Sequence, residues 1–66
     1  MELTAKERVE EELKELETKF EKLGAFLNSE RSANVKGVNR ALLYMQCHTM
    51  ASYITILKAR LDNWED

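Results

Sequence analysis

The chain has 66 residues, a formal net charge of −2 and a single cysteine. A chain this short forms at most one domain, and it is only marginally stable unless a disulfide, a metal or association helps. One cysteine excludes an internal disulfide, and one Cys with one His does not supply a metal site. We therefore expect a homo-oligomer, a dimer or larger, that carries no metal and no other cofactor.

The beginning of the sequence, Met-Glu-Leu-Thr, has neither the basic nor the apolar region of a secretory signal. No apolar run approaches the roughly 20 residues needed to cross a bilayer. A free cysteine is typical of a reducing compartment. These features predict a cytoplasmic protein with no membrane partner.

The first segment, from about residue 4 to about residue 28, has the pattern of an amphipathic helix. Thr4-Ala5-Lys6-Glu7 matches the capping box, in which the threonine oxygen and the glutamate each accept a backbone N–H. An apolar stripe then follows at spacings of three and four residues. It consists of Val9, Leu13, Leu16, Phe20, Leu23 and Leu27.

Polar residues between about 29 and 36 predict a turn. The second helix, from about residue 37 to about residue 64, starts between Asn34 and Asn39, because both are plausible N-cap residues. Gly37 would cost about 1 kcal/mol if it lay inside this helix.

The second helix carries two apolar stripes, and a single partner helix can cover only one of them. We therefore predict an all-α fold: one domain over residues 1–66, an antiparallel two-helix hairpin that assembles into a four-helix-bundle dimer or a larger homo-oligomer. The core stripe consists of Leu43, Cys47, Met50, Ile54, Leu57, Leu61 and Trp64, and the second of Leu42, Met45, Tyr53 and Ile56.

No residue pattern in the chain indicates catalysis. Cys47 and His48 are adjacent, so on a helix they point roughly 100° apart and cannot act as a nucleophile and its base. The paired carboxylates of the first helix lie opposite its apolar stripe, which favours a solvated face. Gly-rich phosphate loops and metal signatures are missing from the sequence. We expect a protein that is not an enzyme.

The turn and its borders are the only basic part of the chain. Residues 23–48 carry a net charge of +2, against −3 for residues 1–22 and −1 for residues 49–66. Amides and cations near a helix N-terminus favour anions, and arginine binds phosphate through two hydrogen bonds. The alternative is a polar turn that is simply solvated. The candidate ligand-binding residues are Asn28, Arg31, Lys36, Asn39 and Arg40.

A third group lies on the second helix, where Gln46, Tyr53 and Arg60 are spaced seven residues apart and therefore share one face. These residues either set the register between paired helices or contribute to a ligand site between subunits. The predicted interface consists of Leu42, Met45, Gln46, Met50, Tyr53, Ile56, Leu57 and Arg60.

The second helix resembles that of small phage and prophage proteins named from an open reading frame in a crAss-like phage. Their pattern is LL-x-x-Q…M-x-x-Y-x-x-(I)L-x-x-R, and Leu23-x-x-Phe26-Leu27-x-Ser29-Glu30 is similar as well. Residues 35–40 depart from the Ser-capped, acidic helix start of that family. The matching residues of the pattern are Leu42, Leu43, Gln46, Met50, Tyr53, Leu57 and Arg60.

This resemblance implies a phage accessory protein that acts in the host cytoplasm. More distantly, the hairpin is similar in architecture to phage sponge proteins that disarm CBASS and Thoeris immunity by sequestering cyclic nucleotide signals between subunits. We therefore expect a host-takeover or counter-defence protein that binds a cyclic-nucleotide-type immune signal at a subunit interface. The alternatives are a protein-interaction module that binds a host protein and a small RNA- or DNA-binding bundle. An acidic first helix and a pI near 5.4 argue against nucleic acid.

Overall fold

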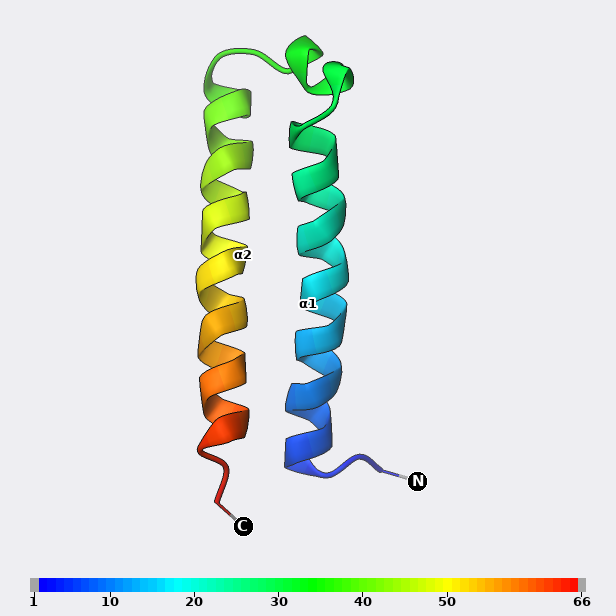
Figure 1. The fold of residues 1–66 in the computed structure, drawn as a ribbon, viewed down its shortest axis with the longest axis vertical. Coiled ribbons are helices and arrows are strands. Elements are labelled where there is room, and N and C mark those ends of the chain that lie inside the picture. The colour runs from blue at the N-terminus through cyan, green and yellow to red at the C-terminus, as the bar shows by residue number, and fades with distance from the viewer. Residues whose placement is uncertain (1, 66) are drawn as a thin grey trace.

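The computed structural model describes residues 2–65 and consists of two long helices joined by a short 3-10 segment (Figure 1). Helix α1 spans Ala5–Leu27, the 3-10 helix η1 spans Glu30–Asn34, and α2 spans Val38–Asp62. The two long helices lie side by side and run antiparallel, with η1 at one end of the molecule (Figure 1). The prediction of an all-α helical hairpin is confirmed.

Helix α1 begins with the capping box that the sequence predicts. The Glu7 backbone N–H donates to Thr4 Oγ1, and the Thr4 backbone N–H donates to Glu7 Oε1, each at 3.1 Å. Two N–H groups that would otherwise lack a partner are thereby satisfied. The bond from the Thr4 backbone is the main reason why the pKa of the Glu7 carboxyl group lies below its ordinary value, because this bond favours the charged form.

Two serine hydroxyls terminate α1. Ser29 Oγ donates to the Phe26 carbonyl at 2.6 Å, and Ser32 Oγ lies 3.1 Å from the Leu27 carbonyl and 2.9 Å from that of Ser29. Carbonyls in the last turn of a helix have no hydrogen-bond donor within it, and the two serine hydroxyls provide donors for them. Ser32 is only 4% exposed as a result. The connection is therefore a bonded 3-10 turn rather than a loose polar loop.

Helix α2 begins at Val38, and its N-cap is Gly37 rather than either asparagine. Gly37 has φ 65° and ψ −138°, a backbone conformation that is accessible to glycine and strained for other residues. Asn34 is the last residue of η1, and Asn39 already lies inside α2. The expectation of an Asn N-cap is thus wrong, and the glycine lies outside the helix, where the penalty for an internal glycine does not apply.

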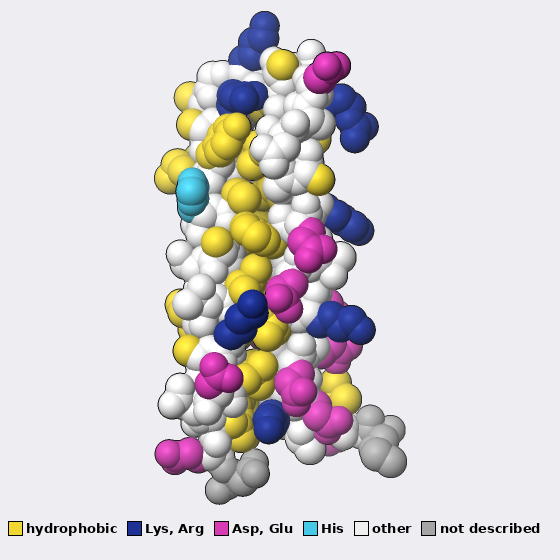
Figure 2. Space-filling view, in the orientation of Figure 1, with side chains coloured by type: hydrophobic (Ala, Val, Ile, Leu, Met, Phe, Trp, Pro, Cys, Tyr) yellow, Lys and Arg dark blue, Asp and Glu magenta, His cyan; other side chains and the backbone are white. Residues whose placement is uncertain are grey.

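The core is a narrow seam between α1 and α2. Val9, Leu27, Ile54 and Leu57 are each less than a tenth exposed, and Leu57 is 0% exposed. Figure 2 shows this seam as a line of apolar side chains between the two helices. The remaining residues of the two predicted core stripes are half-buried: Leu13, Leu16, Phe20, Leu23, Leu43, Cys47, Met50, Leu61 and Trp64.

The hairpin is elongated, with principal extents of 47 × 23 × 16 Å and a radius of gyration of 15.0 Å. A compact chain of this length has a radius of gyration of about 11 Å. Over the described residues, neither helix combines the length and the apolar character that a membrane crossing requires.

The two glycines provide a matched test of the backbone argument. Gly24 lies inside α1, where a Cβ atom would meet nothing within 4 Å, whereas Gly37 has a positive φ. Gly24→Ala should stabilise the fold by about 0.5–1 kcal/mol through helix propensity. Gly37→Ala should destabilise it by about 1–2 kcal/mol through backbone strain.

Urea unfolding followed by circular dichroism, at one fixed chain concentration, measures both changes. Shifts of the same sign for the two variants would contradict the assigned backbone conformations.

Candidate functional site

The predicted ligand-binding residues all lie at the turn end of the hairpin, which contains residues 28–40 (Figure 1). Asn28 is the C-cap of α1, and Arg31 lies in η1. Lys36 precedes the Gly37 N-cap, and Asn39 lies in the first turn of α2. The side chains of Asn28, Arg31, Lys36 and Asn39 are exposed. They are available to a ligand or to solvent.

Arg40 differs from the other four because it is half-buried and already bonded within the chain. Its Nη1 donates to the Ser32 carbonyl at 2.6 Å, and its Nη2 lies 3.4 Å from the Tyr44 hydroxyl. The guanidinium carbon lies 5.5 Å from the centre of the Tyr44 ring, within the range of a cation–π contact. Arg40 therefore ties α2 to η1. The exposed cations at this end are Arg31 and Lys36.

The second candidate surface is the outer face of α2, which we define as Val38, Leu42, Met45 and Ile56. These side chains are 74%, 51%, 61% and 54% exposed, respectively. Figure 2 shows apolar side chains at the outer edge of α2 as well as in the seam. Large apolar residues that share one helix face and remain exposed mark an interaction surface.

The predicted interface residues divide between this outer face and the seam. Leu57 is completely buried and Met50 is half-buried in the seam of a single hairpin. Leu57 therefore belongs to the core of one chain. Gln46 and Arg60 are exposed. Gln46 lies on the flank between the seam and the outer face, whereas Arg60, which follows Leu42 by five whole helical turns, lies on the outer face itself.

Polar contacts link the helices on both flanks of the seam. The Tyr53 hydroxyl donates to Glu12 Oε1. This hydrogen bond is the main cause that raises the pKa of Tyr53 above its ordinary value, with desolvation and the Glu12 charge adding to it and Arg60 opposing it. An ion pair joins Lys58 Nζ and Glu17 Oε2 at 3.6 Å. Both contacts are exposed, so we expect them to set the register more than the stability.

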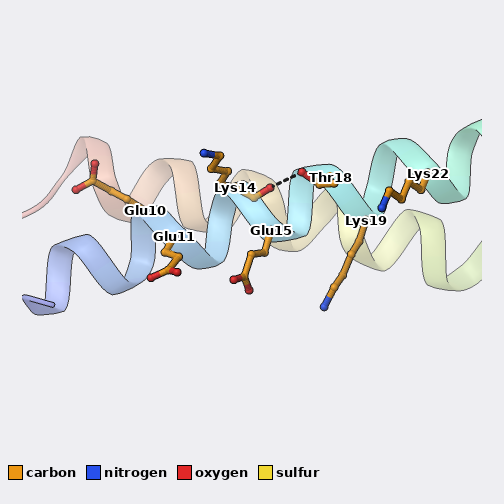
Figure 3. Close-up of a pocket in the computed structure, with 7 residues that line it drawn as sticks. All are labelled: Glu10, Glu11, Lys14, Glu15, Thr18, Lys19 and Lys22. Atoms are coloured by element: carbon orange, nitrogen blue, oxygen red, sulfur yellow. Dashed lines mark hydrogen bonds between the residues drawn. The ribbon is translucent and has the colours of Figure 1, made fainter. Parts of the chain in front are cut away.

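A shallow depression on the outward face of α1 has little value as a ligand site (Figure 3). All the residues that line it come from one helix, and three acids are balanced there by three lysines. A single convex helix encloses no ligand, and a neutral set of exposed side chains selects no ion. The predicted solvated face of α1 fits this arrangement. The lining residues are Glu10, Glu11, Lys14, Glu15, Thr18, Lys19 and Lys22.

Within residues 2–65, no group of three or more His, Cys, Asp and Glu side chains lies together in a way that could hold a metal ion. Cys47 is a half-buried free thiol, and His48 is exposed.

Three structurally important residues escaped the sequence reasoning. Val38 is the most exposed of the large apolar residues, and its spacing of four residues before Leu42 was a usable signal. The Ser32 hydroxyl donates to the Leu27 carbonyl at the end of α1, and its position in a stretch of polar residues gives no sign of this role. Glu12 could not be recognised as the partner of Tyr53, because a sequence separation of 41 leaves the register between the two helices open.

The fold and these surfaces define a small helical hairpin with a polar, basic end and an exposed apolar face. The family model for Sequestin matches residues 3–63. The chain therefore belongs to the Sequestin family. No curated protein matches the chain, and no solved structure does either. The resemblance to the crAss-like phage proteins stays a prediction.

The bond from Arg40 to Ser32 predicts a structural role for this arginine. Arg40→Ala should lower the free energy of unfolding by about 1–2 kcal/mol, because the Ser32 carbonyl loses a charged donor. Arg31→Ala, at an exposed position, should change it by less than about 0.5 kcal/mol. Urea unfolding compares the two variants. Equal effects would rule out the structural role of Arg40.

The contact between Tyr53 and Glu12 predicts a pH dependence at high pH. Because folding raises the pKa of Tyr53, the contribution of this bond is complete below the unfolded pKa and is lost as pH rises through the folded value. Wild-type stability should therefore fall as pH increases from roughly 9 to 11.

Thermal unfolding across this pH range provides the measurement. Tyr53→Phe should flatten the dependence, whereas Tyr44→Phe should leave it unchanged. An equally steep fall in Tyr53→Phe would contradict this role of the bond between Tyr53 and Glu12.

Proposed function

We propose that this Sequestin-family chain is a non-enzymatic binding protein whose hairpins assemble and sequester a small anionic ligand at a boundary between subunits. The ligand class that fits best is a cyclic-nucleotide-type immune signal, and the biological setting would be counter-defence by a phage. In this role the protein lowers the free concentration of the signal by holding it, without changing it chemically.

The observation that carries this proposal is the family match over residues 3–63. The family name itself points to sequestration, and the match covers both long helices and the turn between them. The resemblance of the second helix to phage proteins supports the proposed setting.

The charges at the turn end support an anionic ligand. Arg31 and Lys36 are exposed there, and the first turn of α2 contains no acidic residue. The N-terminal end of a helix carries a partial positive charge, which adds to the effect of the two cations. The acidic residues of α1 all precede residue 22, so Glu30 of η1 is the one acidic residue among residues 28–40 of the turn end. A phosphate group would therefore be attracted to the turn end.

Assembly is the second requirement of the proposal. One turn end presents a small, open cluster of polar groups, and an open surface holds a small ligand weakly. Several copies could enclose the ligand between them and multiply the number of cations around it. The exposed outer face of α2 provides a reason for copies to associate, because its burial removes apolar area from water.

A second candidate function follows from the same outer face. An exposed apolar face along one helix is also the kind of surface that receives an amphipathic helix of another protein. In that case binding would depend on Leu42 and Met45 and not on the cations of the turn end.

The ligand proposal predicts binding of at least one member of a panel of cyclic di- and trinucleotides and ADP-ribose derivatives. Native mass spectrometry and isothermal titration calorimetry measure it. Replacing both exposed cations, Arg31→Gln with Lys36→Gln, should weaken binding by about tenfold or more, which corresponds to about 1.4 kcal/mol. Lys22→Gln, an exposed lysine on the far side of α1, provides the matched control and should bind as the wild type does.

The released ligand should also have its original mass after heat denaturation of the complex. Recovery of a cleaved nucleotide would show an enzyme and not a sequestering protein. A panel with no binding at concentrations on the order of tens of micromolar would remove the ligand proposal. Suppose instead that an amphipathic helix of another protein binds, and that Leu42→Asp abolishes this binding while the cation substitutions leave it unchanged. That result would favour the second candidate function.

A further inference from the structure

Helix α2 contains a long segment without any formal charge. From Ala41 to Leu57 there is no Asp, Glu, Lys or Arg, although 33% of the whole chain is charged. This segment includes Leu42, Met45 and Ile56 of the exposed outer face. A partner with a charged surface would lose hydration there and gain no complementary charge. The surface that fits best is another uncharged apolar face.

Three residues of this face, Leu42, Met45 and Ile56, together with Tyr53 beside it, are arranged symmetrically about Thr49. Leu42 lies seven residues before Thr49 and Ile56 lies seven residues after it. Met45 and Tyr53 lie four residues before and after it in the same way. If two copies of α2 are placed antiparallel about a twofold axis at Thr49, Leu42 of each copy faces Ile56 of the other, and Met45 faces Tyr53. A twofold interface requires such a self-complementary surface.

Thr49 is suited to the centre of this interface. It is the smallest of these residues, so it allows two helices to approach closely. Its hydroxyl already donates to the Met45 carbonyl at 2.9 Å, so burial would leave no donor without a partner. The Tyr53 hydroxyl is likewise bonded, to Glu12 of its own chain. The polar groups on this face therefore oppose burial very little.

The surface area of the hairpin supports a partner of this size. The chain exposes 5459 Å², whereas a compact monomer of its mass exposes about 4,300 Å². The excess of roughly 1,100 Å² exceeds the approximately 800 Å² that each partner contributes to a standard protein interface.

We propose that the outer face of α2 is covered by the same face of a second copy, in an antiparallel pair with its twofold axis at Thr49. The inference specifies the assembly step of the proposed function and rests on it. The occupant is a second copy because the middle of the face, from Leu42 to Ile56, carries no charged residue and repeats its pattern in reverse about Thr49; Val38, at the end of the face, would lie opposite Arg60 of the copy.

Cysteine cross-linking in a Cys47→Ser background tests this register at positions that are exposed in the hairpin. Thr49→Cys should cross-link to itself through a short bis-maleimide linker. Leu42→Cys alone and Ile56→Cys alone should not, because an antiparallel pair separates each from its copy by about 21 Å along the helix. A mixture of these two variants should cross-link. Thr55→Cys, about 120° around the helix from Thr49, serves as the control that should not cross-link.

Circular dichroism confirms that each variant is folded, and Cys47→Ala replaces Cys47→Ser if serine at this position lowers the helix content. Self-cross-linking of Leu42→Cys would overturn the antiparallel arrangement in favour of a parallel one. Equal cross-linking of Thr49→Cys and Thr55→Cys would show that the outer face is not the contact. A monomer in analytical ultracentrifugation at low micromolar concentration would overturn the pair and the proposed assembly together.

The two proposals fail in different ways. An oligomer that binds the nucleotide panel but lacks the Thr49 cross-link would remove this pairing and leave the proposed function. The predicted cross-links in a protein that binds no nucleotide would remove the ligand and leave the pairing.

Discussion

Two packed helices share a single line of contact, so a hairpin can bury only one strip of apolar side chains between them. In this chain that strip includes four residues that are less than a tenth exposed. Helix α2 carries apolar residues on its far side as well, where Val38 and Met45 are mostly in contact with solvent. Leaving this side exposed forgoes about 25 cal/mol for each Å² of apolar area. A seam this thin gives a 66-residue chain little stability, which favours association through the exposed side of α2.

The polar residues of the turn region serve two different purposes. Ser29, Ser32 and Arg40 satisfy backbone carbonyls, so they hold η1 between the two long helices. The side chains of Arg31 and Lys36 are exposed, and among the described residues they donate no hydrogen bond to a backbone carbonyl. A rigid turn that presents exposed cations keeps them in a fixed position relative to both helices, so less conformational freedom is lost when a ligand binds.

Most of the fold could be predicted from local pattern. The capping box at Thr4 and Glu7 is a short-range motif, and the apolar stripes of both helices follow from helical periodicity. Helix α2 starts at Val38, inside the interval 34–39 where local pattern places it, but its N-cap residue could not be predicted, because an asparagine N-cap and a Gly37 with positive φ are both compatible with the local sequence. The role of Arg40 escaped prediction because it depends on the path of a 3-10 turn eight residues earlier. Side chains at the turn look alike in sequence, whether they bond to the backbone or face solvent.

Because the seam is thin, the fraction of folded chains should depend on how much of the protein a cell makes. When folding and pairing draw on the same apolar surface, the stability of the folded state rises with the concentration of chains. Under the proposed pairing, the amount of folded protein then increases more steeply than the amount of polypeptide made. At low expression most chains would be exposed to proteases, and above a threshold nearly all of them would be protected. A protein that acts by titration would thereby gain a switch-like onset from its small core, without any dedicated regulatory element.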